Sequence, residues 1–237
     1  MGLSCLVATW FLGACTPPPG DPPDSTPAYP DEITAFVDVS VVSMADEELD
    51  EGRTVIVYKG HILDIVEAEV ELPPKATIIN GTGRYLMPGL VDMHVHNWYE
   101  DDHILFVANG VTTVRNLWGD PIHLKWRREI KRGDRIGPRI YTTGPIMDGN
   151  PPIWSGSEVV TTVDGARQSV LMQKEAGYDA IKVYNLLAKD VWQAIIDTAD
   201  QEGLPVVGHV PDAVGYEAVI ESSQQTVEHL NGFIDAA

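Results

Sequence analysis

Residues 86–96 read LMPGLVDMHVH, an apolar β run that follows a Pro-Gly pair and ends in a His-X-His motif. On a strand, residues i and i+2 point to the same side, so His94 and His96 can both reach one metal ion. Two histidines on a polar strand face are the alternative. The end of a strand is where parallel barrels build their active sites, which favours the metal. Asp92 points to the opposite face, where we expect a structural hydrogen bond.

Downstream of this stretch, apolar β runs alternate with helical patterns, which predicts a parallel sheet with helices outside it. The predicted strands are 86–96, 111–117, 139–143, 180–184, 204–209 and 226–230. The predicted helices are 101–109, 122–132, 157–176, 189–202 and 213–222. Six strands suit an open doubly wound sheet, whereas a (β/α)8 barrel needs eight strands in about 250 residues. A barrel starting at residue 85 is therefore short by roughly two units.

Upstream, the pattern is one of short strands and turns. The β-rich runs are 33–43, 53–59, 62–66 and 76–80. The acidic stretch 46–52 (DEELDEG) is predicted to be a solvated loop. Hairpin signals of this kind indicate a separate strand-rich region over residues 32–84, ahead of the alternating region at 85–237.

The first 31 residues have the character of an export signal and a linker. The apolar run in residues 1–15 is too short to span a bilayer and suits the core of a signal peptide. It ends in LGAC, which resembles the lipobox of bacterial lipoproteins, with Cys15 as the lipidated residue. No Lys or Arg precedes Arg53, so a plain hydrophobic terminus is the alternative. Residues 16–31 hold seven of the 17 prolines and predict an extended linker.

Composition narrows the class of protein. The 237 residues are 44% hydrophobic and carry a formal net charge of −19. A core of useful size is expected, and nucleic acid or an anionic membrane surface is disfavoured as a partner. Both cysteines, Cys5 and Cys15, precede the linker, so the body has no disulfide or thiolate metal site. We expect an exported protein that contacts a bacterial envelope membrane only through its lipid anchor.

Three further candidates lie on later strands. Lys182 is inside the run 180–184, where a lysine is costly unless it is paired, neutralised or modified. His209 and His229 end the next two runs. Taken singly, each residue has a purely structural explanation. The lysine could form a buried ion pair, and the histidines could be hydrogen-bonded core residues. Their shared position, about one βα unit apart, favours a metal site. The remaining histidines, expected to be surface or packing residues, are His61, His103 and His123.

Aromatic residues also follow the strand ends. Tyr184 comes two residues after Lys182 and is a candidate for substrate binding in the same pocket. For four others aromatic packing is the default expectation, although loops after strand ends line such pockets: Trp98, Tyr99, Trp118 and Trp154.

The segment 86–96 resembles the first barrel strand of the amidohydrolase superfamily. Three more segments resemble its imidazolonepropionase-like branch, which includes Xaa-Pro dipeptidases: IKVY at 181–184, GHVP at 208–211 and VEHL at 227–230. The resemblance runs from about residue 33 to the end. It implies a TIM-type (β/α)8 barrel truncated after about strand six, preceded by part of a small β-sandwich.

The resemblance also implies a centre of two divalent metal ions. His94 and His96 would bind the more buried ion, and His209 and His229 the other. Lys182 would bridge them as a carbamate formed with carbon dioxide. Zinc is the first expectation for nitrogen and oxygen ligands. A metal-activated water would then hydrolyse an amide or cyclic amide bond in a small molecule or dipeptide.

One catalytic group of that family is not found in the sequence. The family places an aspartate, which moves the proton, at the end of an eighth strand. Asp235 lies just beyond His229 and is no substitute. We therefore expect an N-terminal fragment of a longer enzyme, inactive and unstable alone. Two alternatives stay open: a catalytically dead lipoprotein that uses this body as a binding module, and an open six-stranded α/β domain without metal.

Overall fold

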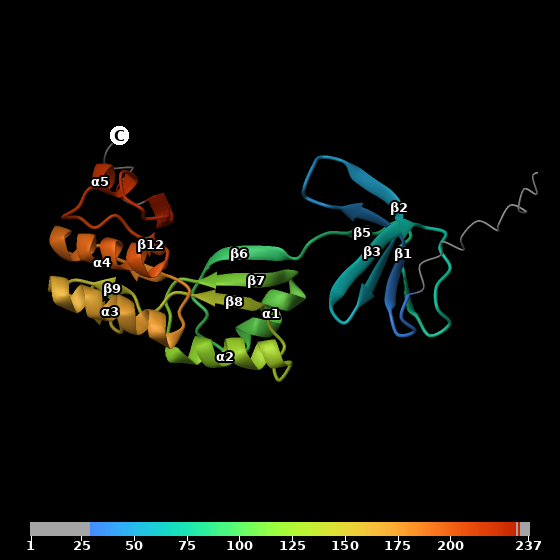
Figure 1. Ribbon diagram of the computed structural model, residues 1–237, viewed down its shortest axis with the longest axis horizontal. Coiled ribbons are helices and arrows are strands. Elements are labelled where there is room, and N and C mark those ends of the chain that lie inside the picture. Colours follow the sequence, from blue (N-terminus) through green and yellow to red (C-terminus); the bar gives the residue numbers. More distant parts are fainter. Residues whose placement is uncertain (1–28, 231, 233–237) are drawn as a thin grey trace, which may run out of the picture. The chain divides into compact units, whose positions relative to one another are not determined.

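The computed structural model describes residues 29–230 and 232. The expected signal segment, Cys15, Asp235 and the linker up to residue 28 lie outside this part of the chain. The chain divides into two compact units, Met1–Pro88 and Gly89–Ala237, each of which is described by itself (Figure 1). Across the described residues, none of the helices combines the length and apolar character needed to cross a membrane.

The first unit is a five-stranded sheet. Its strands are β1 (Thr34–Val42), β2 (Leu49–Tyr58), β3 (His61–Glu67), β4 (Thr77–Asn80) and β5 (Tyr85–Leu86). β2 pairs antiparallel with β1 and β3, while β4 and β5 pair parallel with β1. The acidic loop predicted at 46–52 is wrong in its second half. There the backbone extends the β1–β2 ladder, with Leu49 opposite Val42, and the ladder needs only backbone groups, so acidic side chains are no obstacle.

The second unit is a mixed α/β structure, as the alternating pattern predicts. Its strands are β6 (Leu90–Val95), β7 (Val111–Asn116), β8 (Arg139–Thr142), β9 (Met147–Asp148), β10 (Glu158–Val159), β11 (Ile181–Val183), β12 (Val206–Gly208) and β13 (Thr226–Val227). Its helices are α1 (Asp102–Ala108), α2 (Pro121–Arg132), α3 (Val163–Ala176), α4 (Lys189–Glu202), α5 (Tyr216–Ile220) and the short 3-10 helix η1 (Glu228–Leu230).

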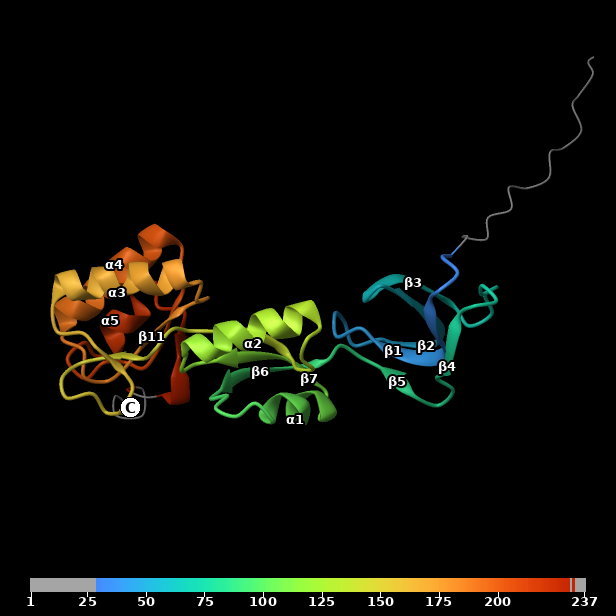
Figure 2. The ribbon, with the colours of Figure 1, turned by 90° about the horizontal axis from the view of Figure 1, so that it is seen from below.

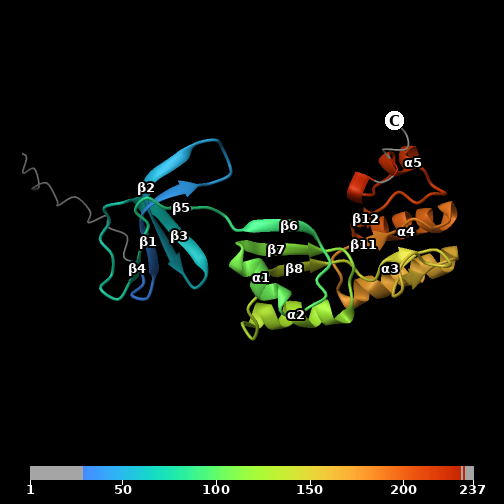
Figure 3. The same ribbon diagram turned by 180° about the vertical axis from the view of Figure 1, so that it is seen from behind.

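Six of these strands follow one another in parallel. β6, β7 and β8 form one sheet, and β11, β12 and β13 are neighbours in a second sheet that also holds β9 and β10. A parallel bridge between Thr143 and Ala180 links the two sheets at β8 and β11. Every pairing in this series is parallel. The carboxyl ends of all six strands therefore lie at the same end of the array (Figures 1 and 3).

Helices cover one face of this array. α1 and α2 pack against β6–β8 through a core that includes Val114, Trp126 and Ile140. α3 and α4 lie side by side and cover β9, β11 and β12, with Trp192 and Ile195 in their core (Figure 2). Because side chains alternate along a strand, the residue between the helix-facing Ile181 and Val183 points to the opposite face. That residue is Lys182.

Three predicted boundaries were wrong for physical reasons. The strand predicted at 86–96 is interrupted, because Tyr85–Leu86 pairs with β1 and the next strand begins only at Leu90, after Pro88. The helix predicted from residue 157 starts at Val163, because residues 158–159 pair with β9 and Thr162 caps the helix. The strand predicted at 226–230 stops at Val227, since His229 and Leu230 have positive φ angles of 60° and 55°.

Candidate metal centre

The five side chains predicted as metal ligands converge on one hollow at the carboxyl ends of the strands. His94 lies in β6 and His96 directly after it; Lys182 is in β11; His209 follows β12; His229 is in η1 after β13. All five line a hollow of about 250 Å³, together with Trp98, Trp118, Ile146, Trp154 and Tyr184. The structure thus brings together residues from four strands and 136 positions of sequence.

The four imidazoles stand around the hollow at van der Waals spacing. The ring centroids are 5.2 Å apart for His94 and His96, 4.6 Å for His94 and His229, and 5.3 Å for His209 and His229. Across the described residues, no three His, Cys, Asp or Glu side chains are close enough to form a ready metal cluster. The four imidazoles therefore surround a cavity without forming a ready metal cluster. The fit of this cavity to a metal ion depends on the chemistry of these donor groups.

Lys182 is almost completely removed from solvent. It is 1% exposed, and burial lowers its pKa to about 8; the charge of Glu228 raises that pKa and the charge of Arg115 lowers it further. No salt bridge to Lys182 is found among the described residues, so the ion-pair explanation has no support. A buried amine with a lowered pKa carries a neutral fraction near pH 7, and the neutral amine is the form that reacts as a nucleophile.

The pKa values of three of these imidazoles, His94, His96 and His209, are lowered. Burial is the largest cause of lowering the pKa of His96 to about 4, and the charges of His94, Lys182 and His229 add to it. Burial likewise lowers the pKa of His209 to about 3. The pKa of His94 is also lowered, again mainly by burial. Neutral imidazole is the form that binds a metal ion, so these groups are ready to bind at neutral pH.

His209 is oriented by its neighbours. Its Nδ1 lies 2.6 Å from Oδ1 of Asn185, and its ring packs 4.0 Å from the ring of Tyr184. Since an amide oxygen only accepts, Nδ1 carries the proton and Nε2 carries the lone pair. The preceding Gly208 allows this close approach, because a Cβ there would lie 2.2 Å from the carbonyl oxygen of Val183.

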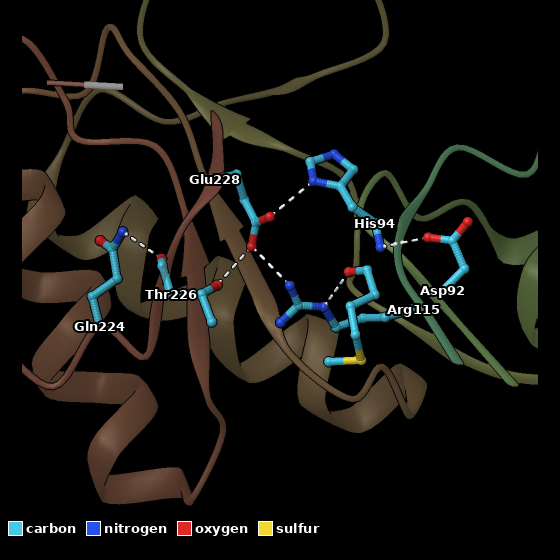
Figure 4. A network of polar contacts seen from close by, with 7 residues as sticks. Asp92, His94, Arg115, Gln224, Thr226 and Glu228 are labelled. Carbon is cyan, nitrogen blue, oxygen red and sulfur yellow. Dashed lines mark hydrogen bonds and ion pairs between the residues drawn. The ribbon is translucent and has the colours of Figure 1, made fainter. Parts of the chain in front are cut away.

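His94 is oriented by a network that sequence reasoning missed (Figure 4). Its Nδ1 donates to Oε2 of the buried Glu228 at 2.8 Å. Oε1 of Glu228 accepts from Thr226 Oγ1 at 2.6 Å and from Arg115 Nη2 at 2.9 Å, and Arg115 Nε donates to the carbonyl oxygen of Met93 at 2.7 Å. The one available signal was an acidic residue directly before a strand-end histidine.

Asp92 and two other histidines have the structural roles expected of them. Asp92 Oδ1 accepts the backbone N–H of His94 at 3.1 Å. His103 and His123 are fully buried and hold Asn97: His103 Nε2 accepts from its side-chain amide at 2.7 Å, and His123 Nε2 donates to its carbonyl oxygen at 2.6 Å. They fix the loop that follows the His-X-His motif.

Comparison with solved structures identifies the fold. A bottromycin amidohydrolase superposes with a TM-score of 0.73 at 29% identity, covering 87% of this chain and 44% of that one. A Bifidobacterium longum protein described as a prolidase gives 0.67 at 25%, covering 77% and 51%. A Xaa-Pro dipeptidase shares the fold at 0.64 and 19%, covering 79% and 58%. The resemblance to the amidohydrolase superfamily, in its Xaa-Pro dipeptidase-like branch, is confirmed.

Each superposition covers most of this chain but only part of the matched protein. The chain spans about half the length of the amidohydrolase and of the prolidase. No protein-family model and no curated protein matches the sequence. The resemblance to this superfamily therefore rests on the similar solved structures together with the converging residues above.

Proposed function

We propose that the protein is a metal-dependent hydrolase of carbon–nitrogen bonds, acting on amide or cyclic amide substrates. The observation that carries this proposal is the convergence of Lys182 and four imidazoles on one hollow at the strand ends. Bringing a buried lysine and four histidines from separate strands together costs free energy that packing alone does not explain.

The donor set fits two divalent ions. His94 and His96 would hold one ion and His209 and His229 the other, with Lys182 as a carbamate between them. Zinc is our first candidate because all donors are nitrogen or carbamate oxygen. Bound ions would supply a water of near-neutral pKa and polarise the scissile carbonyl.

The chain's own residues would prepare this chemistry. Asn185 and Glu228 hold His209 and His94 in the tautomer whose Nε2 carries the lone pair. The burial of Lys182 would keep part of its amine neutral for reaction with carbon dioxide. The proton-shuttling aspartate of the family is not among the described residues, so the general acid–base role has no residue assigned to it.

We further propose that the six parallel strands are six of the eight strands of a (β/α)8 barrel, with the first unit as part of a β-sandwich. The successive parallel order and the siting of all five candidates at the carboxyl ends support this proposal. Catalysis would then require residues outside those described here. The intact mass of the protein isolated from its native source tests this point.

For the substrate we propose an amide-linked small molecule or dipeptide. One similar structure is a prolidase in complex with N-methylphosphonate-L-proline, and another is a Xaa-Pro dipeptidase with methionine in its active site. Xaa-Pro dipeptides are therefore the first substrates to assay.

Lipid anchoring through Cys15 at a bacterial envelope membrane is also a proposal. The motif ending at Cys15 and the proline-rich linker support it. Growth of a bacterial host with a labelled fatty acid should label the wild-type chain and leave a Cys15→Ala variant unlabelled. Equal labelling of both would contradict it.

Metal content is the decisive measurement for the hydrolase proposal, because the donor set lies within the chain. The chain is equilibrated with Zn²⁺ and bicarbonate, desalted and analysed for metal. We expect about two ions per chain, and at most one in a His94→Asn/His96→Asn variant. His61→Asn, an exposed histidine of the first unit, is the matched control. Absence of zinc from the folded wild-type chain would overturn the proposal and favour the binding-module or open-sheet alternative.

A further inference from the structure

Four aromatic side chains form a continuous wall on one side of the candidate metal centre. The wall consists of Trp98, Trp118, Trp154 and Tyr184, which follow β6, β7, β9 and β11. Ring centroids are 4.9 Å apart for Trp98 and Trp118 and 5.9 Å for Trp118 and Trp154. Trp154 Nε1 then donates to the hydroxyl of Tyr184 at 2.7 Å. Packing was the expectation for these tryptophans, and they pack against one another while lining the hollow.

The wall leaves much of its apolar surface uncovered. Trp98 is 45% exposed and Trp154 is 48% exposed. By contrast, Trp126 and Trp192, which lie in the helix-facing cores, are 5% and 1% exposed. Large aromatic side chains are seldom left this open, and contiguous apolar surface beside a pocket marks a binding surface.

Buried polar residues fix the loops that carry these rings. Asn97, next to Trp98, is held by His103 and His123 as described above, and its backbone N–H donates to Asn116. The Asn116 side chain in turn donates to the carbonyl oxygen of Trp118 at 2.9 Å. The wall therefore stands on hydrogen-bonded loops, which makes it a preformed surface.

A single carboxylate secures the other half of the wall. Asp148 is fully buried and accepts backbone N–H groups from Gly149 at 2.9 Å, Ile153 at 2.9 Å and Leu186 at 2.7 Å. These bonds join the loop that carries Trp154 to the segment after Tyr184. Of the residues that line the hollow, none is acidic, and Lys182 is the one aliphatic amine. The wall offers flat apolar faces, and the lining of the hollow offers no carboxylate to pair with a cationic substituent.

We propose that this aromatic wall selects the substrate: it binds a flat, uncharged ring carried next to the scissile carbon–nitrogen bond. The substrate class is then amides with an aromatic or similarly planar apolar substituent. Offset or edge-to-face stacking on tryptophan provides the recognition, and the ring covers surface that is otherwise exposed to water. This inference rests on the proposed hydrolase function and names the substrate preference of the same site.

Binding of simple probes tests the wall without requiring turnover. Saturation-transfer NMR on the full chain compares benzamide with acetamide. We expect benzamide to bind detectably and acetamide not to bind, and we expect Trp154→Leu and Trp98→Leu to weaken benzamide roughly 3- to 10-fold each. Tyr99→Leu is the matched control, because Tyr99 adjoins Trp98, is 72% exposed and does not line the hollow. Equal binding of both amides, or an equal loss in the control, would overturn the inference.

Trp154→Phe separates stacking from hydrogen bonding. It keeps an aromatic face but removes the donor to Tyr184, so benzamide binding should stay within about twofold of wild type if stacking dominates. Loss as large as that of Trp154→Leu would show that the hydrogen bond positions the wall, and stacking would then not be the recognition.

Turnover separates this inference from the function on which it rests. With the zinc-loaded protein isolated from its native source, kcat/KM should be higher for Phe-Pro than for Asp-Pro, and the Trp154→Leu variant of that protein should show a smaller ratio. Hydrolysis without this preference would support the proposed hydrolase function and contradict substrate selection by the aromatic wall. Benzamide binding to a chain that takes up no metal supports the wall as a binding surface and overturns the hydrolase.

Discussion

Two hollows in the second unit are lined by different elements and differ in chemistry. The larger, about 760 Å³, lies near the start of β8 and is lined by α2 residues with Arg139 and Asp179. The smaller, about 250 Å³, lies at the carboxyl ends and holds the candidate metal centre. If cavity volume were the criterion, the larger hollow would be chosen as the functional site.

The charged groups of the two hollows differ in how far they are removed from water. In the larger hollow, Arg128, Lys131 and Arg139 are exposed, and Arg127 is paired with Asp179 at 2.6 Å. These charged groups are solvated or paired, so the surface carries little desolvation cost. In the smaller hollow, Lys182 and His209 are 1% and 3% exposed, and burial lowers their pKa values to about 8 and about 3. Groups held away from their ordinary titration range mark the functional site better than the size of the cavity does.

The sharpest test of this comparison replaces the buried amine. Lys182→Met keeps a long unbranched side chain while removing the charge. We expect metal content to fall from about two ions per chain to one or none, because the bridging group is lost. We also expect the metal-free protein to melt at a higher temperature, since a desolvated charge disappears; each kcal/mol gained corresponds to about 2–4 °C at this size.

Elemental analysis and thermal unfolding measure both effects. Lys189→Met, at the exposed start of α4, is the control and should change neither. If Lys182→Met instead retained both ions and lowered the melting temperature, the lysine would be a structural residue.

The second test concerns the orientation of His94. Glu228→Ala removes the acceptor of its Nδ1 proton, and we expect zinc affinity to fall about 10- to 100-fold, as is usual when a group that orients a ligand is lost. Glu228→Gln keeps an acceptor oxygen at that position and should recover much of this loss. Titration against a competing chelator gives the affinities.

Arg115→Met provides a companion to that test. It removes the cation that secures Glu228, so we expect an intermediate loss of zinc affinity. Glu217→Ala in α5, away from the network, should match wild type. An unchanged affinity in Glu228→Ala would contradict the proposed orientation of His94.

The third test uses pH. The folded pKa of His209 is about 3, below the ordinary value near 6.5. As pH falls from 7 toward 5, the unfolded chain takes up a proton that the folded chain excludes, so the free energy of unfolding should decrease. His209→Asn should flatten this decrease, whereas His61→Asn should not. Urea midpoints across this range measure it, and equal slopes in wild type and His209→Asn would contradict it.

The alternation of strands and helices was predictable because it follows from the local periodicity of apolar residues. The candidate ligands were predictable for a related reason: strand-end histidines and a lysine inside an apolar run are visible in short windows of sequence. The two-residue strand β9 left no such pattern, and its pairing with β10 displaced the predicted start of α3. Tertiary pairing overrode the local signal there.

The supporting residues could not be read from the sequence. Arg115 and Glu228 are 113 positions apart and meet only because β7 and β13 end at the same place. Asp148 likewise joins two loops that are 38 positions apart. Each is an ordinary polar residue in its own window, and its role follows from which strands become neighbours.

The smallest expected effect completes the comparison of the two hollows. Arg128→Gln and Lys131→Gln remove exposed cations from the larger hollow, and neither has an acidic partner among the described residues. We expect stability within about 0.5 kcal/mol of wild type and unchanged zinc content, because solvated surface charges contribute little to either. Urea unfolding and metal analysis check both quantities. A loss of zinc in these variants would mean that the charge at the amino-terminal ends of the strands reaches the metal centre, and the two hollows would then act together.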